Sequence, residues 1–200
     1  MKYLIGIDEA GRGPLAGPVA VGAVVVPRDF DWELVAGAKD SKQMTPKSRE
    51  ILYSTMSALR TGGQLNFAVA FSSSSMIDTY GIVPAIKSAL ARALEKVLEA
   101  RPLGLEMEIL LDGNLRAPEN FSNQRTIIRG DEIEPIISLA SIAAKVERDR
   151  LMVRLATKYP VYSFETHKGY GTAAHCALIR TNGLSAIHRR SFCGSLISSQ

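Results

Sequence analysis

The apolar residues of this chain form short runs that predict strands separated by helices. Pro18–Pro27 is almost entirely apolar, which is typical of a strand that is buried on both faces. Lys2–Asp8 is rich in apolar and β-branched residues and ends at a turn. The predicted strands are Lys2–Asp8, Pro18–Pro27, Leu65–Phe71, Glu108–Leu111 and Arg125–Ile128, and the first two are expected to form a hairpin.

Helical spacing appears between these strands. In Pro84–Ala100 the apolar residues recur every three or four positions, which places them on one stripe of a helix. Thr45 followed by Pro46 is a good helix start, because the hydroxyl caps the first turn and proline suits it. The predicted helices run from Pro46 to about Arg60, over Pro84–Ala100, Ile136–Tyr159 and Thr172–Thr181, with a short turn at Met76–Tyr80 capped from Ser72–Ser75.

This order of elements predicts an α/β fold, with a mixed central sheet flanked by helices. The length of 200 residues suits a single domain, residues 1–200, whose C-terminal part from about residue 160 is helical. No internal repeat or linker divides the sequence.

Composition narrows the possible classes of protein only slightly. Lys and Arg number 24 against 20 Asp and Glu, and the net charge of +4 permits a polyanionic partner without requiring one. Two cysteines without a CxxC pair, together with the lack of a signal peptide pattern, favour a cytoplasmic location. No apolar run reaches membrane-spanning length, so we expect no membrane partner.

Acidic residues follow several of the predicted strands. Asp8 and Glu9 close the first strand and precede a Gly11–Arg12–Gly13 turn. Asp112 follows the fourth strand, and Asp131 follows the fifth. Carboxylates at strand ends suit a hard divalent cation, and the backbone of a glycine turn beside them suits a phosphate or sugar hydroxyl. The pattern therefore predicts metal-dependent chemistry on a phosphorylated substrate.

Simpler interpretations of these acids remain open at this point. Because neighbouring side chains of a strand point to opposite faces, Asp8 shares a face with Leu4 and Gly6, whereas Glu9 faces away. One of the two could bind a metal while the other forms a surface ion pair. Taken alone, Asp112 fits a turn-forming Asp-Gly pair, and Asp131 fits an acid that flanks a helix.

Two nucleotide-binding motifs can be excluded. The pair Gly11 and Gly13 after a strand resembles the dinucleotide-binding fingerprint, but the third glycine, Gly17, is one position too far. The segment that follows is strand-like, whereas that fingerprint needs a helix N-terminus beneath the pyrophosphate. The sequence also contains no GxxxxGK[ST] loop.

An ordered set of motifs makes the interpretation specific. The blocks are DEAGRGP at Asp8–Pro14, Asp40-Ser41-Lys42, Leu111-Asp112-Gly113, Gly130-Asp131, Ala140–Val146 with Arg148-Asp149, His167–Thr172 and His188–Phe192. Together they resemble the bacterial ribonuclease HII family, and the resemblance extends from Ile7 to about Gly194. It implies a ribonuclease H-like fold and cleavage of RNA within RNA–DNA hybrids. It also implies incision 5′ to single ribonucleotides embedded in duplex DNA.

The resemblance assigns roles to particular residues. The four active-site acids of the family fall on Asp8, Glu9, Asp112 and Asp131, which would hold two Mg²⁺ or Mn²⁺ ions for two-metal-ion hydrolysis that leaves 3′-hydroxyl and 5′-phosphate ends. In proteins such ions lie roughly 3.5–4 Å apart. The other expected substrate contacts are Gly11, Arg12 and Gly13 at the ribose 2′-hydroxyl, Tyr170 stacked near the RNA–DNA junction, and Lys42, Lys145, His167 and Lys168.

Some of the residues expected to contact the substrate also have simpler interpretations. Lys145 and Asp149 are four residues apart on one predicted helix and could simply pair with each other. His167 could serve as hydrogen-bonding support, with Lys168 the stronger candidate for a phosphate contact. Lys42 could be solvated, and Arg189-Arg190 could either clamp a duplex or only aid solubility. The extra acids Glu132 and Glu134 make Asp131 the least secure of the four alignments.

Three rivals differ from this hypothesis in substrate or class. A DNA resolvase would share the fold but not the order of motifs, and a substrate panel would separate it. A non-catalytic binding module would bind hybrid without consuming it, although a cluster of unneeded carboxylates would then repel a polyanion. Ribonuclease HIII usually carries an additional N-terminal domain, whereas this chain starts at the predicted catalytic strand. We expect a monomer that binds RNA–DNA hybrid.

Overall fold

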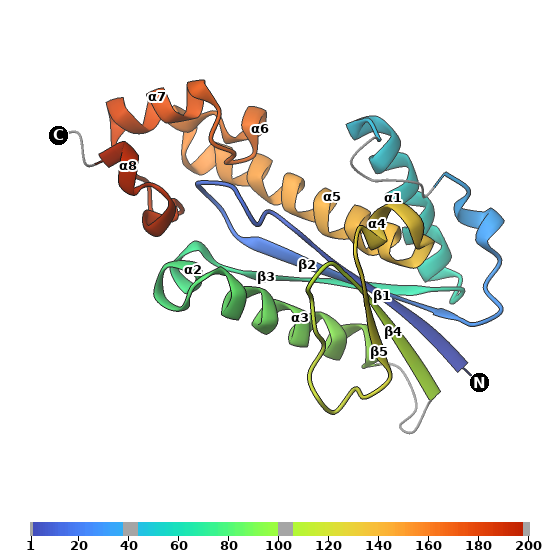
Figure 1. The fold of residues 1–200 in the computed structure, drawn as a ribbon. Coiled ribbons are helices and arrows are strands. Elements are labelled where there is room, and N and C mark those ends of the chain that lie inside the picture. Colours follow the sequence, from blue (N-terminus) through green and yellow to red (C-terminus); the bar gives the residue numbers. More distant parts are fainter. Residues whose placement is uncertain (1, 38–43, 100–105, 198–200) are drawn as a thin grey trace.

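The computed structural model describes residues 2–37, 44–99 and 106–197 and contains a central five-stranded sheet (Figure 1). The strand order is β3-β2-β1-β4-β5. β1 is antiparallel to β2 and parallel to β4, which makes the sheet mixed. The strands are β1 (Lys2–Ala10), β2 (Val19–Pro27), β3 (Asn66–Ser72), β4 (Glu106–Asp112) and β5 (Gln124–Ile127).

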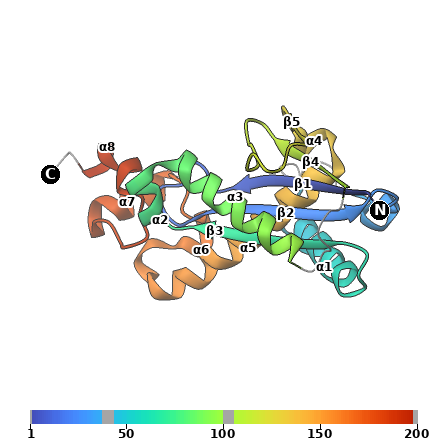
Figure 2. The same cartoon turned by 90° about the horizontal axis from the view of Figure 1, so that it is seen from below.

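Helices cover both faces of the sheet. Figure 1 shows α1 and α5 on one side of the sheet and α3 on the other. Figure 2, seen from below, shows α3 lying across the face of the sheet that it covers. The helices up to α5 are η1 (Trp32–Val35), α1 (Pro46–Thr61), α2 (Ser74–Tyr80), α3 (Ile82–Leu98), α4 (Gly130–Ile133) and α5 (Pro135–Lys158). The mixed α/β fold predicted from the sequence is thus confirmed.

Alternation along β1 divides its side chains between two cores. Ile5 and Ile7 pack with the apolar side of α3, whereas Leu4 packs with the cluster formed by α1 and α5. Asp8 has the same parity as Leu4 and therefore belongs to the α5 side of the sheet. A hydrogen bond between the Asp8 carboxylate and Ser141 on α5 confirms the predicted face.

Two glycines allow α5 to lie directly on the sheet. A Cβ at Gly6 would come within 2.3 Å of the carbonyl oxygen of Ile136, and one at Gly22 within 2.3 Å of that of Ala140. No real Cβ tolerates such a distance from backbone oxygen. Only glycine at both positions lets this helix approach so closely, and the approach fixes where the later turns of α5 cross the end of β1.

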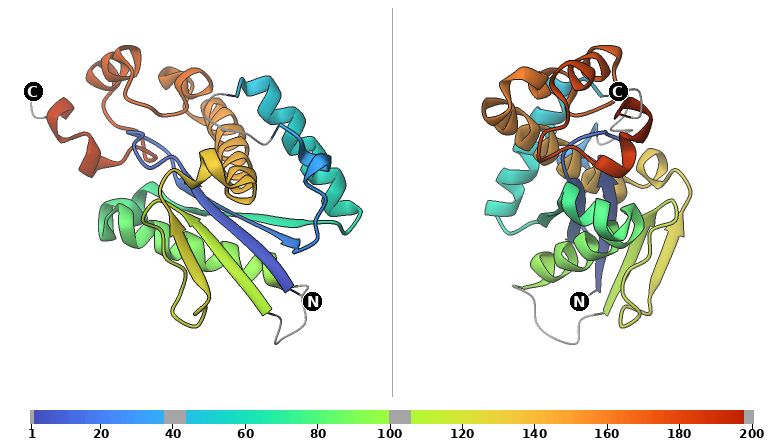
Figure 3. Two further views of the ribbon diagram at one scale, coloured as in Figure 1. Left: turned by 45° about the vertical axis from the view of Figure 1, so that its right-hand side comes forward. Right: turned by 90° about the vertical axis from the view of Figure 1, so that its left-hand side faces the viewer.

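The chain ends in short helices that gather beyond the end of β1, far from the N-terminus (Figure 3). They are η2 (Pro160–Tyr162), α6 (Phe164–His167), α7 (Ala173–Asn182), η3 (Arg190–Phe192) and α8 (Gly194–Ile197). A small apolar cluster around Phe164 and Met152 joins them to the end of α5. No helix within the described ranges is long and apolar enough to cross a membrane.

The predicted elements agree with the structure to within a few residues at their ends. Thr45 caps α1 by accepting a hydrogen bond from the Ser48 amide at 3.1 Å, and Thr172 caps α7 in the same way. β1 continues to Ala10, two residues past its predicted end. The pattern did not predict α4, α6 and α8, because four-residue helices are too short to show a period.

Replacing Gly22 with alanine tests the close approach of α5. The added methyl would strike the Ala140 carbonyl, so we expect Gly22→Ala to lower the free energy of unfolding by about 1–3 kcal/mol, the usual cost of overpacking. Urea denaturation measures this change. The control is Gly194→Ala, where a Cβ would meet nothing within 4 Å. Equal stability of the two variants would contradict the packing argument.

Candidate active site

The site lies where two neighbouring parallel strands part. The ladder between β1 and β4 ends at the pair Ile7 and Leu111. The next residue on each strand is a carboxylate, Asp8 on β1 and Asp112 on β4. β1 stays paired with β2 as far as Ala10, so the opening forms on the β4 side only. Ligands of open α/β sheets bind in such crevices at the carboxyl ends of strands.

This opening is a pocket of about 520 Å³, which we call the carboxylate pocket. Its walls come from the end of β1, the glycine turn, β4, α1, α5 and the loop after α6. It brings together eight of the residues singled out from the sequence. The described residues that line it are Asp8, Glu9, Ala10, Gly11, Arg12, Gly13, Arg49, Asp112, Ser141, Lys145 and Tyr170.

Asp8 is the most deeply placed acid of the carboxylate pocket and is only 4% exposed. Burial raises the pKa of Asp8 well above its usual value, and the neighbouring charges of Glu9 and Asp112 raise it further. The hydroxyl of Ser141 on α5 forms a hydrogen bond with its carboxylate and offsets part of this effect. Ser141 reaches Asp8 because α5 lies so close to the sheet.

Glu9 alternates to the other face of β1 yet lines the same pocket, because the pairing of β1 with β4 has already ended at Ile7. Its Oε1 accepts a hydrogen bond from Nη1 of Arg12 at 2.9 Å, an ion pair within the glycine turn. Burial raises the pKa of Glu9, Arg12 lowers it, and Asp112 raises it again. The sequence left open that only one of Asp8 and Glu9 belongs to the site. In the structure both acids line the carboxylate pocket.

Asp112 and Asp131 are connected through the start of α4. The Gly130 amide donates to Oδ1 of Asp112 at 2.7 Å, and the Asp131 amide approaches the same oxygen at 3.4 Å. The side chain of Asp131 is 1% exposed and lies outside the described lining of the pocket. Asp131 is thus in contact with Asp112 but is buried beneath it, outside the lining of the carboxylate pocket.

A buried arginine from the C-terminal segment holds the glycine turn. Arg189 is fully buried and donates to the carbonyl oxygens of Gly11 at 2.7 Å, Arg12 at 2.8 Å and Gly17 at 3.0 Å. Burial lowers the pKa of Arg189 to about 9, and the charge of Arg148 contributes. The expectation that Arg189 clamps a duplex or aids solubility is wrong, because backbone oxygens inside the protein use its guanidinium.

Arg148 on α5 joins the loop between β1 and β2 to the segment after α6. It is also fully buried and donates to the carbonyl oxygens of Pro18, Ala16 and Lys168. A Cβ at Gly11, whose φ is +86°, would lie 2.0 Å from its Nε. Its guanidinium carbon lies 5.6 Å from the ring centre of Tyr170, and the ammonium of Lys145 lies 5.5 Å from that centre. These contacts place Tyr170 at the rim of the pocket.

The remaining expected contacts lie elsewhere. His167 is buried; its Nε2 lies 2.7 Å from the Tyr162 carbonyl, and its Nδ1 accepts from the Gly169 amide at 3.1 Å. Both ring nitrogens are occupied, so His167 supports the loop and a phosphate contact from it is not supported. Lys168 lines a neighbouring pocket, and Lys42 lies outside the described residues. Lys145 pairs with Asp149 at 2.8 Å, as the spacing predicted.

Sequence reasoning missed one lining residue altogether. Arg49 on α1 reaches the carboxylate pocket, although its Nη1 also donates to the Met44 carbonyl at 2.6 Å. It belongs to a polar helix face, and nothing in that pattern distinguishes it from a solvated arginine. Ser141 did fall inside a quoted motif, but its bond to Asp8 appears only in three dimensions.

The donor set of the carboxylate pocket fits a hard divalent cation. Three acids share it. Burial, together with repulsion from the neighbouring carboxylates, raises the pKa values of Asp8 and Glu9, and a cation among them would offset that cost. Within the described part of the chain, no three Asp, Glu, His or Cys side chains already converge closely enough to hold an ion. A cation shared by these acids would therefore need their side chains to turn towards one another.

Comparisons with known proteins agree with this geometry. The family model for ribonuclease HII matches residues 5–195. Ribonuclease HII of Caldicellulosiruptor bescii is 41% identical over 197 residues, covering 98% of this chain and 89% of that protein.

Solved structures show the same architecture. The ribonuclease H2 of Pyrococcus horikoshii OT3 superposes with a TM-score of 0.75 at 26% identity, covering 98% of this chain and 97% of that one. Bst-RNase HIII, solved in complex with Mn²⁺, has a TM-score of 0.71 at 19% identity over 96% of this chain and 68% of that chain, and this likeness shows the fold alone. Because the family model and a 41% identical relative both span nearly the whole sequence, the chain belongs to the ribonuclease HII family, hydrolases that cut RNA within RNA–DNA hybrids.

Proposed function

We propose that this ribonuclease also incises duplex DNA on the 5′ side of a single embedded ribonucleotide, leaving 3′-hydroxyl and 5′-phosphate ends. The observation that carries the proposal is that one pocket holds both the carboxylates and the Gly11–Gly13 turn. A turn without side chains at its glycines lets backbone groups approach a ribose closely. One 2′-hydroxyl beside the scissile phosphate is then enough to select the cleavage position.

We assign Asp8, Glu9 and Asp112 as ligands of two divalent ions, Mg²⁺ or Mn²⁺, with Asp131 supporting them from behind. When bound, such ions activate water as a nucleophile and offset the charge that develops on the phosphate and the leaving oxygen. The oxygen-only donor set supports this assignment, and so does the Mn²⁺ complex of the structural relative Bst-RNase HIII.

The chain's own groups recognise the substrate in this proposal. Arg189 bonds the carbonyls of Gly11 and Arg12, and this holds the glycine turn in place at the wall of the pocket. Tyr170 is 40% exposed at the rim, where its ring can stack against the nucleotide beside the cleavage site. Lys145 lines the pocket and brings a cation near the phosphate. Arg12, once released from Glu9, brings a second.

Removing the central carboxylate tests the assignment of the catalytic site. We expect Asp8→Asn to lower kcat on hybrid duplex by at least ~10³-fold, because charge stabilisation by a bound metal is worth several kcal/mol. Binding of hybrid should persist or tighten, since a negative charge beside a polyanion is removed. The matched control is Asp29→Asn, in the exposed turn after β2. Normal turnover by Asp8→Asn in Mg²⁺ would contradict the assignment.

The same variant tests the electrostatics of the metal-free site. Because the folded-state pKa of Asp8 is raised above the unfolded value of about 3.9, the folded protein binds more protons in that interval, and its stability falls as pH rises through it. Asp8→Asn should therefore have a higher melting temperature than the wild type in EDTA at pH 7.5. The increase should be about 2–4 °C for each kcal/mol gained in the free energy of unfolding. The difference should shrink as the pH approaches 4. A lower melting temperature than wild type at pH 7.5 would refute the argument.

The choice of cleavage position tests recognition of the 2′-hydroxyl. A DNA duplex with one ribonucleotide should be cut once, on its 5′ side, and the same duplex with a 2′-deoxy residue there should stay intact. Denaturing electrophoresis of an end-labelled strand maps the cut. Cleavage of the all-DNA duplex at a comparable rate would rule out the proposed selection, and cleavage on the 3′ side would rule out the proposed register.

A further inference from the structure

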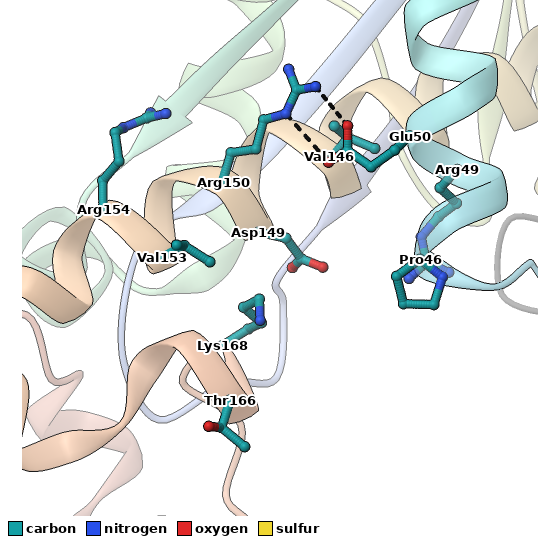
Figure 4. Close-up of a pocket in the computed structure, with 10 residues that line it drawn as sticks. All are labelled: Pro46, Arg49, Glu50, Val146, Asp149, Arg150, Val153, Arg154, Thr166 and Lys168. Carbon is teal, nitrogen blue, oxygen red and sulfur yellow. Dashed lines mark hydrogen bonds and ion pairs between the residues drawn. The ribbon is translucent and has the colours of Figure 1, made fainter.

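A second pocket of about 520 Å³ lies between α1, α5 and the end of α6, and we call it the α1–α5 pocket (Figure 4). It differs from the carboxylate pocket in its chemistry, because basic side chains outnumber acidic ones. The charged side chains that line it are Arg49, Glu50, Asp149, Arg150, Arg154 and Lys168. None of the predicted catalytic acids is among the described residues that line it.

Both acids of the α1–α5 pocket are already neutralised by neighbours. Nη2 of Arg150 donates to Glu50 at 2.6 Å, and Nε of Arg150 donates to its other oxygen at 3.3 Å. Asp149 pairs with Lys145, which belongs to the carboxylate pocket, at 2.8 Å. The acids therefore do not cancel the other cations, and the pocket keeps a net positive field.

Arg154 is the most exposed of the four basic side chains that line the α1–α5 pocket. It lies one turn after Arg150 on α5, and Figure 4 shows the two side chains on the same side of the helix. Its guanidinium makes no ion pair or hydrogen bond with any residue in the described ranges, whereas Arg150 is held by Glu50. A planar fork of donors without a protein acceptor is suited to a phosphate.

The α1–α5 pocket adjoins the catalytic one. Arg49 lines both, and the Lys145–Asp149 pair runs from one to the other. Pro46, the first residue of the sixteen-residue helix α1, also lines the α1–α5 pocket, so the positive end of that helix dipole lies there. A strand whose scissile phosphate enters the carboxylate pocket and continues past Arg49 would reach this surface next.

Electrostatics favours such a continuation. The carboxylate pocket repels a polyanion until metal binds, so affinity for a duplex must come from cations beside it. Most of the affinity of proteins for nucleic acid comes from phosphate neutralisation. Val153, which is 44% exposed, adds apolar surface to the same pocket, and such a surface suits the sugar that joins successive phosphates. A nucleic-acid strand bound in the carboxylate pocket would continue into the α1–α5 pocket. An acidic peptide has no such connection to the catalytic pocket.

We propose that the α1–α5 pocket binds a backbone phosphate of the substrate duplex, away from the scissile linkage, with Arg154 as its principal contact. The inference rests on the proposed function, because the duplex must occupy the carboxylate pocket for its strand to reach Arg154. It predicts a residue that governs affinity but takes no part in bond cleavage.

The test compares Arg154→Gln with Lys96→Gln, a control that removes an exposed cation from α3 on the other face of the sheet. Binding of a fluorescent RNA–DNA hybrid is measured in EDTA over a series of salt concentrations. Loss of one phosphate contact should flatten the slope of log K against log salt by about 0.9 and weaken binding about five- to tenfold at 0.1 M salt. KM should rise while kcat at saturation stays unchanged.

A second measurement locates the phosphate. Methylphosphonate linkages, which are uncharged, are placed one at a time along each strand of the hybrid. Wild type should lose affinity at one linkage outside the scissile position, and Arg154→Gln should lose no further affinity there, which gives a coupling energy for the pair. Lys96→Gln should show the wild-type pattern.

The outcomes separate the two proposals. If Arg154→Gln has the salt slope of Lys96→Gln, or if no linkage couples to it, the phosphate site is overturned while hybrid cleavage by the wild type still supports the proposed function. If wild type binds hybrid with the predicted coupling but does not incise at a single ribonucleotide, the proposed function fails and the phosphate site stands.

Discussion

The contact between α5 and the sheet is the constraint on which the site depends. Glycine at Gly6 and Gly22 lets the helix backbone rest on β1 and β2, and any larger residue would meet a carbonyl oxygen. From that point α5 runs across the end of β1 and delivers Ser141, Lys145 and Arg148 in successive turns. The first bonds Asp8, the second lines the carboxylate pocket, and the third ties the loop between β1 and β2 to the segment after α6.

Two buried arginines connect the C-terminal part to this arrangement. Within the described ranges, neither Arg148 nor Arg189 bonds a carboxylate. Both donate to backbone carbonyls of the segment from Gly11 to Pro18, and Arg148 also donates to the Lys168 carbonyl after α6. Three buried histidines lie in the same part of the chain: the ring of His167 stacks on that of His175, and Nε2 of His175 lies 3.0 Å from Nε2 of His188. Burial lowers the pKa of His188 to about 4 and also lowers the pKa of His175, which keeps these two rings uncharged near neutral pH.

The sequence predicted what depends on short-range patterns. The strands, the Thr45 and Thr172 caps and the face of Asp8 follow from periodicity and capping chemistry. What it could not supply depends on contacts between distant segments. Arg189 and His167 have no local signal that separates a buried, hydrogen-bonded side chain from an exposed one. The placement of Asp131 behind Asp112 likewise depends on α4, a helix too short to show a pattern.

The central claim is that carboxylates from β1 and β4 jointly hold divalent cations at the point where these strands part. Anomalous diffraction from crystals grown with Mn²⁺ tests it most directly, because the signal locates the metal independently of the protein. The account predicts manganese peaks in the carboxylate pocket, with oxygens of both Asp8 and Asp112 as ligands and Glu9 turned away from Arg12. Crystals whose manganese sites all lie elsewhere, with these side chains still apart, would contradict it.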